Sequence, residues 1–209
     1  MLGLPLPQSK GAFVKLYTTE TSGHAYKVRL LLSMLNVPYE RVMIDARSGE
    51  HKKEPYLKIN PRGQVPALEE GGRIWWGSTA CLIYVGRKHG GDTWLPADPA
   101  GIAEVAQWLE VAQNELHYGL QWARGVKTGI RKVGNYEEYR GYGNAGLALL
   151  EGRLAKNQWL ALGRPTLADV ACYAYVSVAP EGGFVLQDYP AVMAWMKRFE
   201  ALPGWIKRL

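Results

Sequence analysis

The stretch Asn60–Leu68, which reads NPRGQVPAL, constrains the fold of this chain more than any other. An Asn-Pro and Arg-Gly turn leads directly into a short apolar strand with a proline at its beginning. Proline lacks an N–H and does not fit a central strand position, so Val65-Pro66 marks a strand end and a candidate cis peptide bond. Two interpretations of these residues stay open. One is a tight turn before a strand, and the other is a backbone edge at Val65 turned toward a peptide-like ligand.

Composition excludes several classes of protein. The 209 residues are 47% hydrophobic, which suffices for one large or two modest packed domains. No apolar run is long enough for a membrane span, and residues 1–12 lack the apolar centre of a secretory signal, so we interpret them as a short N-terminal extension. Cys81 and Cys172 lie far apart without a Cys-x-x-Cys pair, which argues against a disulfide scaffold or a zinc site. We therefore expect no metal, no membrane partner and a cytoplasmic location.

The net charge of +6 raises the question of an anionic partner. The basic residues are spread along the chain, and no zinc-finger, RNA-recognition or basic-helix pattern accompanies them. We therefore expect no nucleic-acid partner. An interaction domain of the translation or nucleic-acid machinery remains an alternative that rests on the charge alone.

The first half of the chain alternates between strand and helix patterns. Apolar alternation predicts four strands, and apolar residues at helical spacing predict helices between them. The strands are expected over 13–17, 39–45, 65–68 and 73–76, and the helices over 22–35, 51–59 and 78–89. This order predicts a small mixed sheet with helices packed on it, which we assign to a domain of residues 13–89.

The second half is helical throughout. It follows residues 90–97, a linker by composition, and begins at Asp98-Pro99, a helix cap with proline in the first turn. The glycine-rich segment 125–134 predicts a bend or loop. Thr166 and Asp169 have the spacing of a capping box, with Asp in the place usual for Glu, and we predict a structural role for Asp169. We assign residues 98–209 to an all-helical domain.

Four passages, in this order and spacing, resemble the glutathione transferases. They are Thr21–Arg29, Glu50–Pro61, Ser78–Ala80 and Pro165–Asp169. The first looks like the active-site turn and first helix of the serine-type classes, which include theta, phi and zeta. The resemblance implies a thioredoxin-like N-terminal domain that binds glutathione, a C-terminal helical bundle domain that supplies the electrophile pocket, and a homodimer.

The resemblance places the catalytic position at Ser22, with glutathione as co-substrate. A free thiol has a pKa of about 8.5. Lowering it by about two units requires roughly 2.7 kcal/mol, an effect within reach of a hydroxyl that donates a hydrogen bond at a helix N-terminus. From the residues alone, a plain helix cap is the favoured interpretation of Ser22. Tyr17, at the end of the first strand, is the rival donor or else a core aromatic.

The other residues that we expect to bind glutathione are Gly23, His24, His51, Lys52, Gln64, Val65, Pro66, Gly77 and Ser78. His24 stands where related serine-type sequences often have asparagine, and it either approaches the sulfur or lies on the surface. The Val65 main chain would pair with the cysteinyl part, and the Ser78 N–H at a helix N-terminus would receive the glutamyl carboxylate. His51 and Lys52 either meet the glycyl carboxylate or form a solvated charge run. Gly77 departs from the family pattern, which has Glu or Asp there. The ligand's ammonium thereby loses its expected partner, which leaves weak binding, a substitute acid or a different thiol as alternatives.

Candidates for the electrophile pocket lie on the long helix after Asp98: Trp108, Gln113, Asn114, His117, Tyr118 and Gln121. Aromatic residues at helical spacing serve a core as readily as a pocket. The prediction is an enzyme that activates the glutathione thiolate for attack on a small hydrophobic electrophile. The alternative is a non-catalytic ligand-binding or interaction protein on the same fold, which Gly77 favours.

Overall fold

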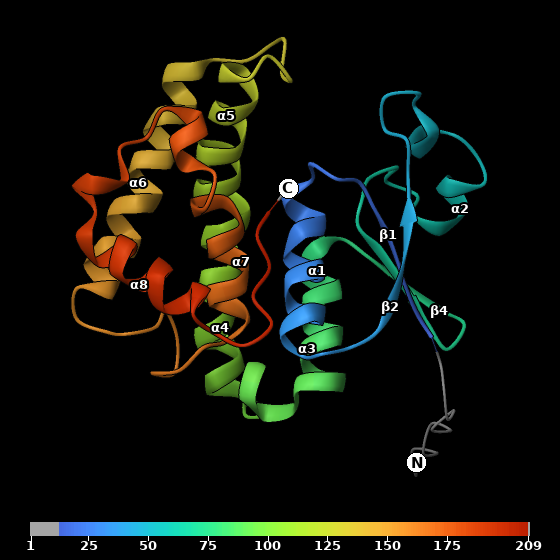
Figure 1. Ribbon diagram of the computed structural model, residues 1–209, viewed down its shortest axis with the longest axis horizontal. Helices are drawn as coiled ribbons and strands as arrows, with labels where there is room; N and C mark the ends of the chain where they lie inside the picture. Colours follow the sequence, from blue (N-terminus) through green and yellow to red (C-terminus); the bar gives the residue numbers. More distant parts are fainter. Residues whose placement is uncertain (1–12, 209) are drawn as a thin grey trace.

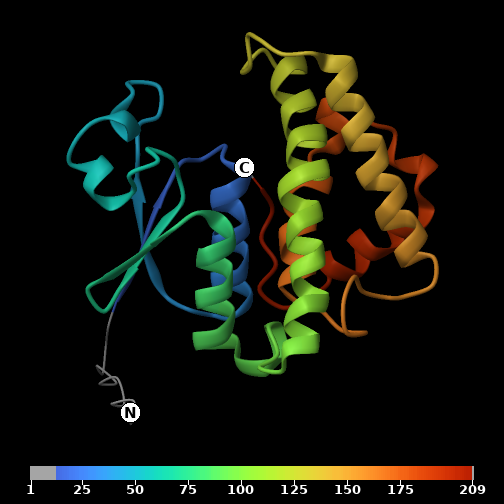
Figure 2. The same cartoon turned by 180° about the vertical axis from the view of Figure 1, so that it is seen from behind.

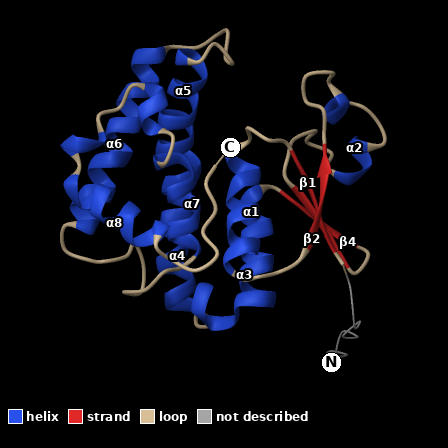
Figure 3. Cartoon of the chain, viewed as in Figure 1, coloured by secondary structure: helices blue, strands red, loops and turns tan. Residues whose placement is uncertain are grey.

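A computed structural model describes residues 13–208, so the expected extension over residues 1–12 lies outside the described residues. A sheet domain and a helical domain stand side by side, as the two opposite views in Figures 1 and 2 show. The strands are confined to the first domain, and the second is helical throughout (Figure 3). This arrangement confirms the predicted fold class.

The sheet has four strands in the order β2-β1-β3-β4. They span β1 (Val14–Thr18), β2 (Tyr39–Met43), β3 (Ala67–Glu70) and β4 (Arg73–Trp76). β1 runs parallel to β2 and antiparallel to β3, and β3 pairs with β4 as a hairpin. This is the mixed sheet that the pattern predicts, although the third strand begins two residues later than expected because Pro66 cannot donate to the ladder.

Two helices, α1 (Gly23–Met34) and α3 (Ser78–Trp94), lie between the sheet and the helical domain (Figures 1 and 2). The short η1 (Glu50–Lys52) and α2 (Tyr56–Ile59) lie on the other side of the sheet. Helix α3 is longer than the expected 78–89. It passes through the predicted linker as far as Trp94, with a break at Gly91, whose φ of 56° is one that glycine adopts freely.

The helical domain is built around one long rod. Helix α4 (Pro99–Val111) continues through the π-helical η2 (Ala112–Gln121) into α5 (Trp122–Lys127). The predicted bend therefore begins only after Lys127. The remaining elements are α6 (Tyr136–Leu154), α7 (Leu167–Val176), η3 (Ala179–Gly182), η4 (Leu186–Asp188) and α8 (Pro190–Glu200). The rod and α6 touch at Gly119 and Gly143, where a Cβ on Gly119 would clash with the Gly143 backbone.

Helix α7 is buried along its whole length, and its first turn confirms the predicted capping box. One carboxylate oxygen of Asp169 accepts from the Thr166 N–H at 2.9 Å and from the Thr166 hydroxyl at 3.2 Å. The other accepts from the Leu160 N–H at 3.2 Å and from the Trp195 indole at 3.0 Å. Burial raises the pKa of Asp169 to about 6, against the effect of these donors. The structural role predicted for Asp169 follows from its four hydrogen bonds.

The chain after α8 returns between α7 and α1 (Figure 1). The Tyr26 hydroxyl donates to the Ile206 carbonyl at 2.7 Å. Arg208 donates to the carbonyls of Ala174 at 3.0 Å and Thr21 at 2.8 Å. This segment therefore fastens the turn before α1 to the helical domain. None of the described helices combines the length and apolarity needed to cross a membrane.

Candidate active site

A cavity of about 480 Å³ lies where the sheet domain meets η2. Its walls come from the start of α1, the loop before β3, the start of α3, and the rod. The lining residues are His24, Asn60, Arg62, Gln64, Val65, Pro66, Trp76, Gly77, Ser78, Thr79, Ala80, Gln113, Asn114, His117, Tyr118 and Trp122. No Asp or Glu stands among these residues, so the polar part of the cavity suits an anion.

The loop before β3 forms one wall, and its shape is set by Asn60, which is buried. The side-chain oxygen of Asn60 accepts from the Arg62 N–H at 3.0 Å, and the side-chain NH2 group of Asn60 donates to the Gln64 carbonyl. The Tyr56 hydroxyl donates to the same Gln64 carbonyl at 2.7 Å. The Val65-Pro66 bond that follows is cis, as predicted. These bonds hold the backbone of residues 62–66 in place at the cavity.

The start of α3 forms the facing wall. Gly77 caps this helix with a φ of 87°, a left-handed value that glycine adopts without strain. The Gln113 side chain donates to the hydroxyls of Ser78 at 3.1 Å and Thr79 at 2.7 Å. The first backbone N–H groups of α3 have no partner within the helix and favour an anion at this end.

Two histidines from different domains meet inside the cavity. His24 Nε2 lies 3.2 Å from His117 Nε2, and His24 Nδ1 lies 2.9 Å from the Tyr175 hydroxyl and 3.1 Å from the Ser78 hydroxyl. Burial, followed by the charge of Lys27, holds the pKa of His24 well below its usual range. The same causes lower the pKa of His117 to about 4. Both rings are therefore neutral near pH 7.

Ser22 caps α1, and its hydroxyl oxygen accepts from the Ala25 N–H at 3.2 Å. The hydroxyl keeps its own proton for donation to a ligand. Gly23, the first residue of the helix, is buried against α7. A Cβ there would lie 2.9 Å from the Tyr175 ring and 3.1 Å from Gln121, so the absent side chain permits the close approach of the two domains.

Comparisons with known proteins agree with this geometry. The family models for the glutathione S-transferase N-terminal and C-terminal domains match residues 21–88 and 135–203. A probable glutathione S-transferase GSTF2 of Oryza sativa is 33% identical over 205 residues, covering 91% of this chain and 93% of that protein. The chain belongs to the glutathione S-transferase family. Glutathione S-transferase APIC of Nicotiana tabacum is 30% identical over 206 residues, covering 94% and 97%.

Solved structures of this transferase family have the same fold. A glutathione S-transferase from Pseudomonas fluorescens superposes with a TM-score of 0.88 at 32% identity, covering 95% of this chain and all of that one. A possible glutathione S-transferase from Rhodopseudomonas palustris superposes with a TM-score of 0.87 at 35% identity, covering 94% and 98%.

Tyr17, the rival donor in this transferase, is not among the residues that line the cavity. Its hydroxyl donates to the Glu69 carboxylate at 2.8 Å. Burial and this carboxylate raise the pKa of Tyr17 to about 12. The hydroxyl is thus committed to a neighbouring strand, in keeping with the interpretation of Tyr17 as a strand aromatic.

Other predicted site residues of this transferase also lie outside the cavity lining, among them Ser22 and Gly23 at the start of α1. His51 and Lys52 belong to η1, and Lys52 donates to the Arg62 carbonyl at 3.3 Å. Trp108 is packed in the core of the helical domain, which removes it from the pocket. Gln121 accepts from Arg208 at 2.9 Å and so fixes the C-terminal segment instead of facing a ligand.

Several lining residues were not predicted from the sequence: Asn60, Arg62, Trp76, Thr79, Ala80 and Trp122. Two of them carried a usable signal. Arg62 lies within the NPRG turn itself, and Trp122 lies one helical turn beyond the predicted Tyr118. Tyr175 carried no such signal, because it sits in an apolar helix far along the chain.

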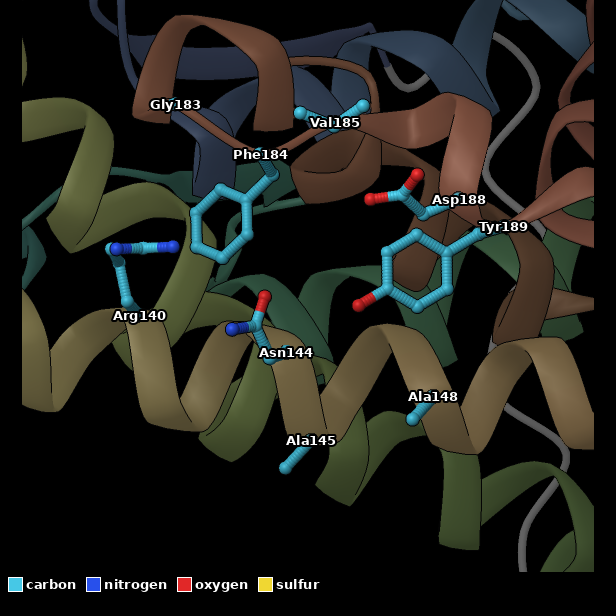
Figure 4. Close-up of a pocket in the computed structure, with 9 residues that line it drawn as sticks. All are labelled: Arg140, Asn144, Ala145, Ala148, Gly183, Phe184, Val185, Asp188 and Tyr189. Atoms are coloured by element: carbon cyan, nitrogen blue, oxygen red, sulfur yellow. The ribbon is translucent and has the colours of Figure 1, made fainter.

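A second cavity, of about 530 Å³, lies within the helical domain. It is lined by α6 and the segment after η3, with Arg140 and Asn144 on one side and Phe184, Asp188 and Tyr189 on the other (Figure 4). It shares no lining residue with the interdomain cavity. The candidate active site of this transferase is therefore the interdomain cavity, where the two domains' polar side chains converge.

Proposed function

We propose that this transferase binds glutathione in the interdomain cavity, lowers the pKa of its thiol and joins the sulfur to a small hydrophobic electrophile. The observation that carries the proposal is the lining of the cavity. It combines a cis-proline backbone edge, a helix N-terminus and the Arg62 side chain, with no carboxylate among the lining residues. Such a surface suits a peptide that brings two carboxylates and a thiolate.

The fit to glutathione is good for its anionic groups and poor for its ammonium. Ser78 and the first N–H groups of α3 suit the glutamyl carboxylate, and Arg62 suits a second anionic group. Gly77 contributes no counter-charge for the ammonium, and no other lining residue is acidic. We therefore propose that the ligand is held mainly through its carboxylates and its cysteinyl main chain.

We assign thiol activation to Ser22, the hydroxyl at the N-terminus of α1. Its hydroxyl is already fixed by the Ala25 N–H at 3.2 Å, so little side-chain freedom is lost when the proton is donated to sulfur. Serine is not a base here, because an unassisted alkoxide is inaccessible at neutral pH. The thiol proton leaves to solvent, and the hydrogen bond stabilises the thiolate that remains.

The electrophile would lie along the rod, beside His117. Tyr118 and Trp122 stand edge to face with ring centroids 4.4 Å apart. Together with Asn114 they also line an adjoining hollow of about 400 Å³ toward α6. Aromatic walls of this kind favour a flat apolar group, and we propose an aromatic electrophile for this subsite.

The test is Ser22→Ala. Wild type should bind glutathione in a calorimetric titration, conjugate it to chlorodinitrobenzene and show thiolate absorbance near neutral pH. The variant should keep the fold and bind glutathione while its thiolate population falls by up to roughly a hundredfold. Tyr17→Phe is the control and should change little. If the wild type binds glutathione but does not conjugate it, the second candidate function, a non-catalytic ligand-binding protein, would be favoured. Gly77, which stands in place of an acidic residue, is the feature that supports this second candidate.

We also propose a homodimer and a cytoplasmic location. Ile83 on α3 and Ile102 on α4 are each 41% exposed and line the same groove, and an exposed apolar surface between two helices is compatible with an interface. Cys81 and Cys172 are both free and buried, as is usual in a reducing compartment. Sedimentation of the purified protein at twice the monomer mass would support the dimer, and monomer mass would refute it.

A further inference from the structure

Tyr175 is part of the site but has no role in the mechanism above. It lies on α7, is fully buried, and its hydroxyl is 2.9 Å from Nδ1 of His24. Burial raises the pKa of Tyr175 well above its usual value, so the hydroxyl keeps its proton. A buried hydroxyl needs a partner. Among the described residues, His24 Nδ1 is the one hydrogen-bond partner of this hydroxyl, so Tyr175 donates its proton there and this nitrogen is the acceptor of the ring.

The contact with His117 fits this direction. The Nε2 atoms of His24 and His117 lie 3.2 Å apart, and both rings are neutral, so one ring donates to the other through the proton between them. Because Nδ1 of His24 accepts from Tyr175, the single proton of the His24 ring lies on Nε2. His24 therefore donates through its Nε2–H, and His117 Nε2 accepts.

The charges around His24 keep it in this neutral form. The groups that face it from the neighbouring elements are Lys27, Arg62, Ser78, His117, Tyr175 and Arg208. None of them is a carboxylate. A second proton on the His24 ring would thus be repelled, whereas an anion near Nε2 would be attracted by both the N–H and the surrounding cations.

We propose that Tyr175 is a positioning residue that holds His24 in the Nε2–H tautomer, and that this N–H donates a second hydrogen bond to the thiolate beside the Ser22 hydroxyl. The inference rests on the proposed function, because it takes the glutathione thiolate as the anion. The thiolate replaces the neutral His117 ring as acceptor, and hydrogen bonds to an ionised acceptor are the stronger kind. The ring keeps its single proton throughout, and the thiol proton leaves to solvent.

The first experiment reads the tautomer directly and needs no ligand. Nitrogen chemical shifts of histidine in the labelled wild-type protein, measured at pH 7, distinguish Nε2–H from Nδ1–H. The chain has four histidines, so His24→Gln assigns the signal. We expect the Nε2–H form in the wild type. An Nδ1–H form would overturn the inference and leave the proposed function standing.

The second experiment compares Tyr175→Phe with Tyr173→Phe. Tyr173 lies on the same helix, is also buried, and donates instead to Glu200 at 2.8 Å, so its substitution is a matched control. Ultraviolet absorbance of bound thiolate is followed against pH. Tyr175→Phe should lower the thiolate population at pH 7 about threefold to tenfold, the factor for one weakened hydrogen bond. Tyr175→Phe should also allow His24 to populate the Nδ1–H tautomer. The control, Tyr173→Phe, should change neither the thiolate population nor the tautomer of His24.

The outcomes separate the two proposals. Equal thiolate titration in the wild type and in Tyr175→Phe would overturn the inference, whether or not Ser22→Ala is defective. Absence of glutathione binding by the wild type in calorimetry would overturn the proposed function, and the donor role of His24 with it. If Tyr175→Phe fails to fold, the wild-type tautomer still decides.

Discussion

Lys27 offers the sharpest test of the electrostatics of this site. Its side chain is 1% exposed, and its ammonium stands over the Tyr175 ring at 4.2 Å from the centroid. None of the ion pairs formed within residues 13–208 includes it. Burial lowers the pKa of Lys27 from 10.5 to about 7. We predict that Lys27→Met stabilises the protein at neutral and acid pH.

The magnitude follows from the two pKa values. A lowering from 10.5 to about 7 corresponds to about 5 kcal/mol of unfavourable free energy when the ammonium is charged in the folded state. The contact with the Tyr175 ring offsets roughly 1–2 kcal/mol of this. Methionine has a similar length and needs no hydrogen bond. We therefore expect Lys27→Met to raise the free energy of unfolding by about 3 kcal/mol at pH 6.

The lowered pKa of Lys27 also determines how the stability of the protein changes with pH. Below pH 7, Lys27 is protonated in both the folded and the unfolded chain, so the destabilisation is present in full. Between pH 7 and 10.5 the unfolded chain binds the proton and the folded protein does not, so wild-type stability rises with pH. The advantage of Lys27→Met should thus be roughly 1–3 kcal/mol smaller at pH 9 than at pH 6.

Urea unfolding of the wild type and of Lys27→Met at pH 6 and pH 9 measures this difference. The other titratable groups affect both proteins alike, so their contributions cancel in the comparison. Lys58→Met is the control, because Lys58 is a surface lysine with its side chain 73% exposed. Its effect should stay within about 0.5 kcal/mol at either pH. Lower stability of Lys27→Met at pH 6, or a gain that does not change with pH, would refute the reasoning.

Three further predictions concern single contacts. Asp169→Asn should lower the free energy of unfolding by about 2–4 kcal/mol, because its amide must face two of the four donors; urea unfolding equal to wild type would contradict this. Gly119→Ala should cost about 1–3 kcal/mol by the same assay, whereas Gly141→Ala on α6, whose Cβ would meet nothing, should cost nothing. Gly77→Glu should lower stability by about 1–3 kcal/mol because its φ is 87°, yet tighten glutathione binding in calorimetry relative to Gly77→Gln, which has the same strain without the charge.

The fold could be predicted from the sequence where local patterns decide it. Alternating and helical apolar spacings identify the four strands and the principal helices, and Val65-Pro66 marks the cis turn. Two of the errors fall at glycines. The pair at 90–91 predicted a linker, but one left-handed residue at Gly91 lets the helix resume as far as Trp94. Gly125 lies in a helix that continues to Lys127, since packing against η3 outweighs its weak helix propensity.

The candidate site was predictable only in its local parts. Gln64, Val65 and Ser78, which line the cavity, stand at a turn and a helix start that a short segment defines. The contact of Tyr175 with His24 joins residues 151 positions apart, and no local pattern encodes it. Likewise, nothing in the period of the rod distinguishes His117, which faces the cavity, from Trp108, which faces the core.

The cations of the site and its two-domain construction belong to one physical arrangement. Lys27 and Arg208 are buried at the boundary between the domains, and Arg62 faces the cavity from the loop before β3. A charge buried without a counter-ion destabilises a fold, as the lowered pKa of Lys27 reflects. The same charge favours an anion in the neighbouring cavity, because its field is weakly screened there. The buried cations therefore lower the stability of the fold while they stabilise a bound thiolate. Lys27→Met should raise the free energy of unfolding and lower the thiolate population of bound glutathione.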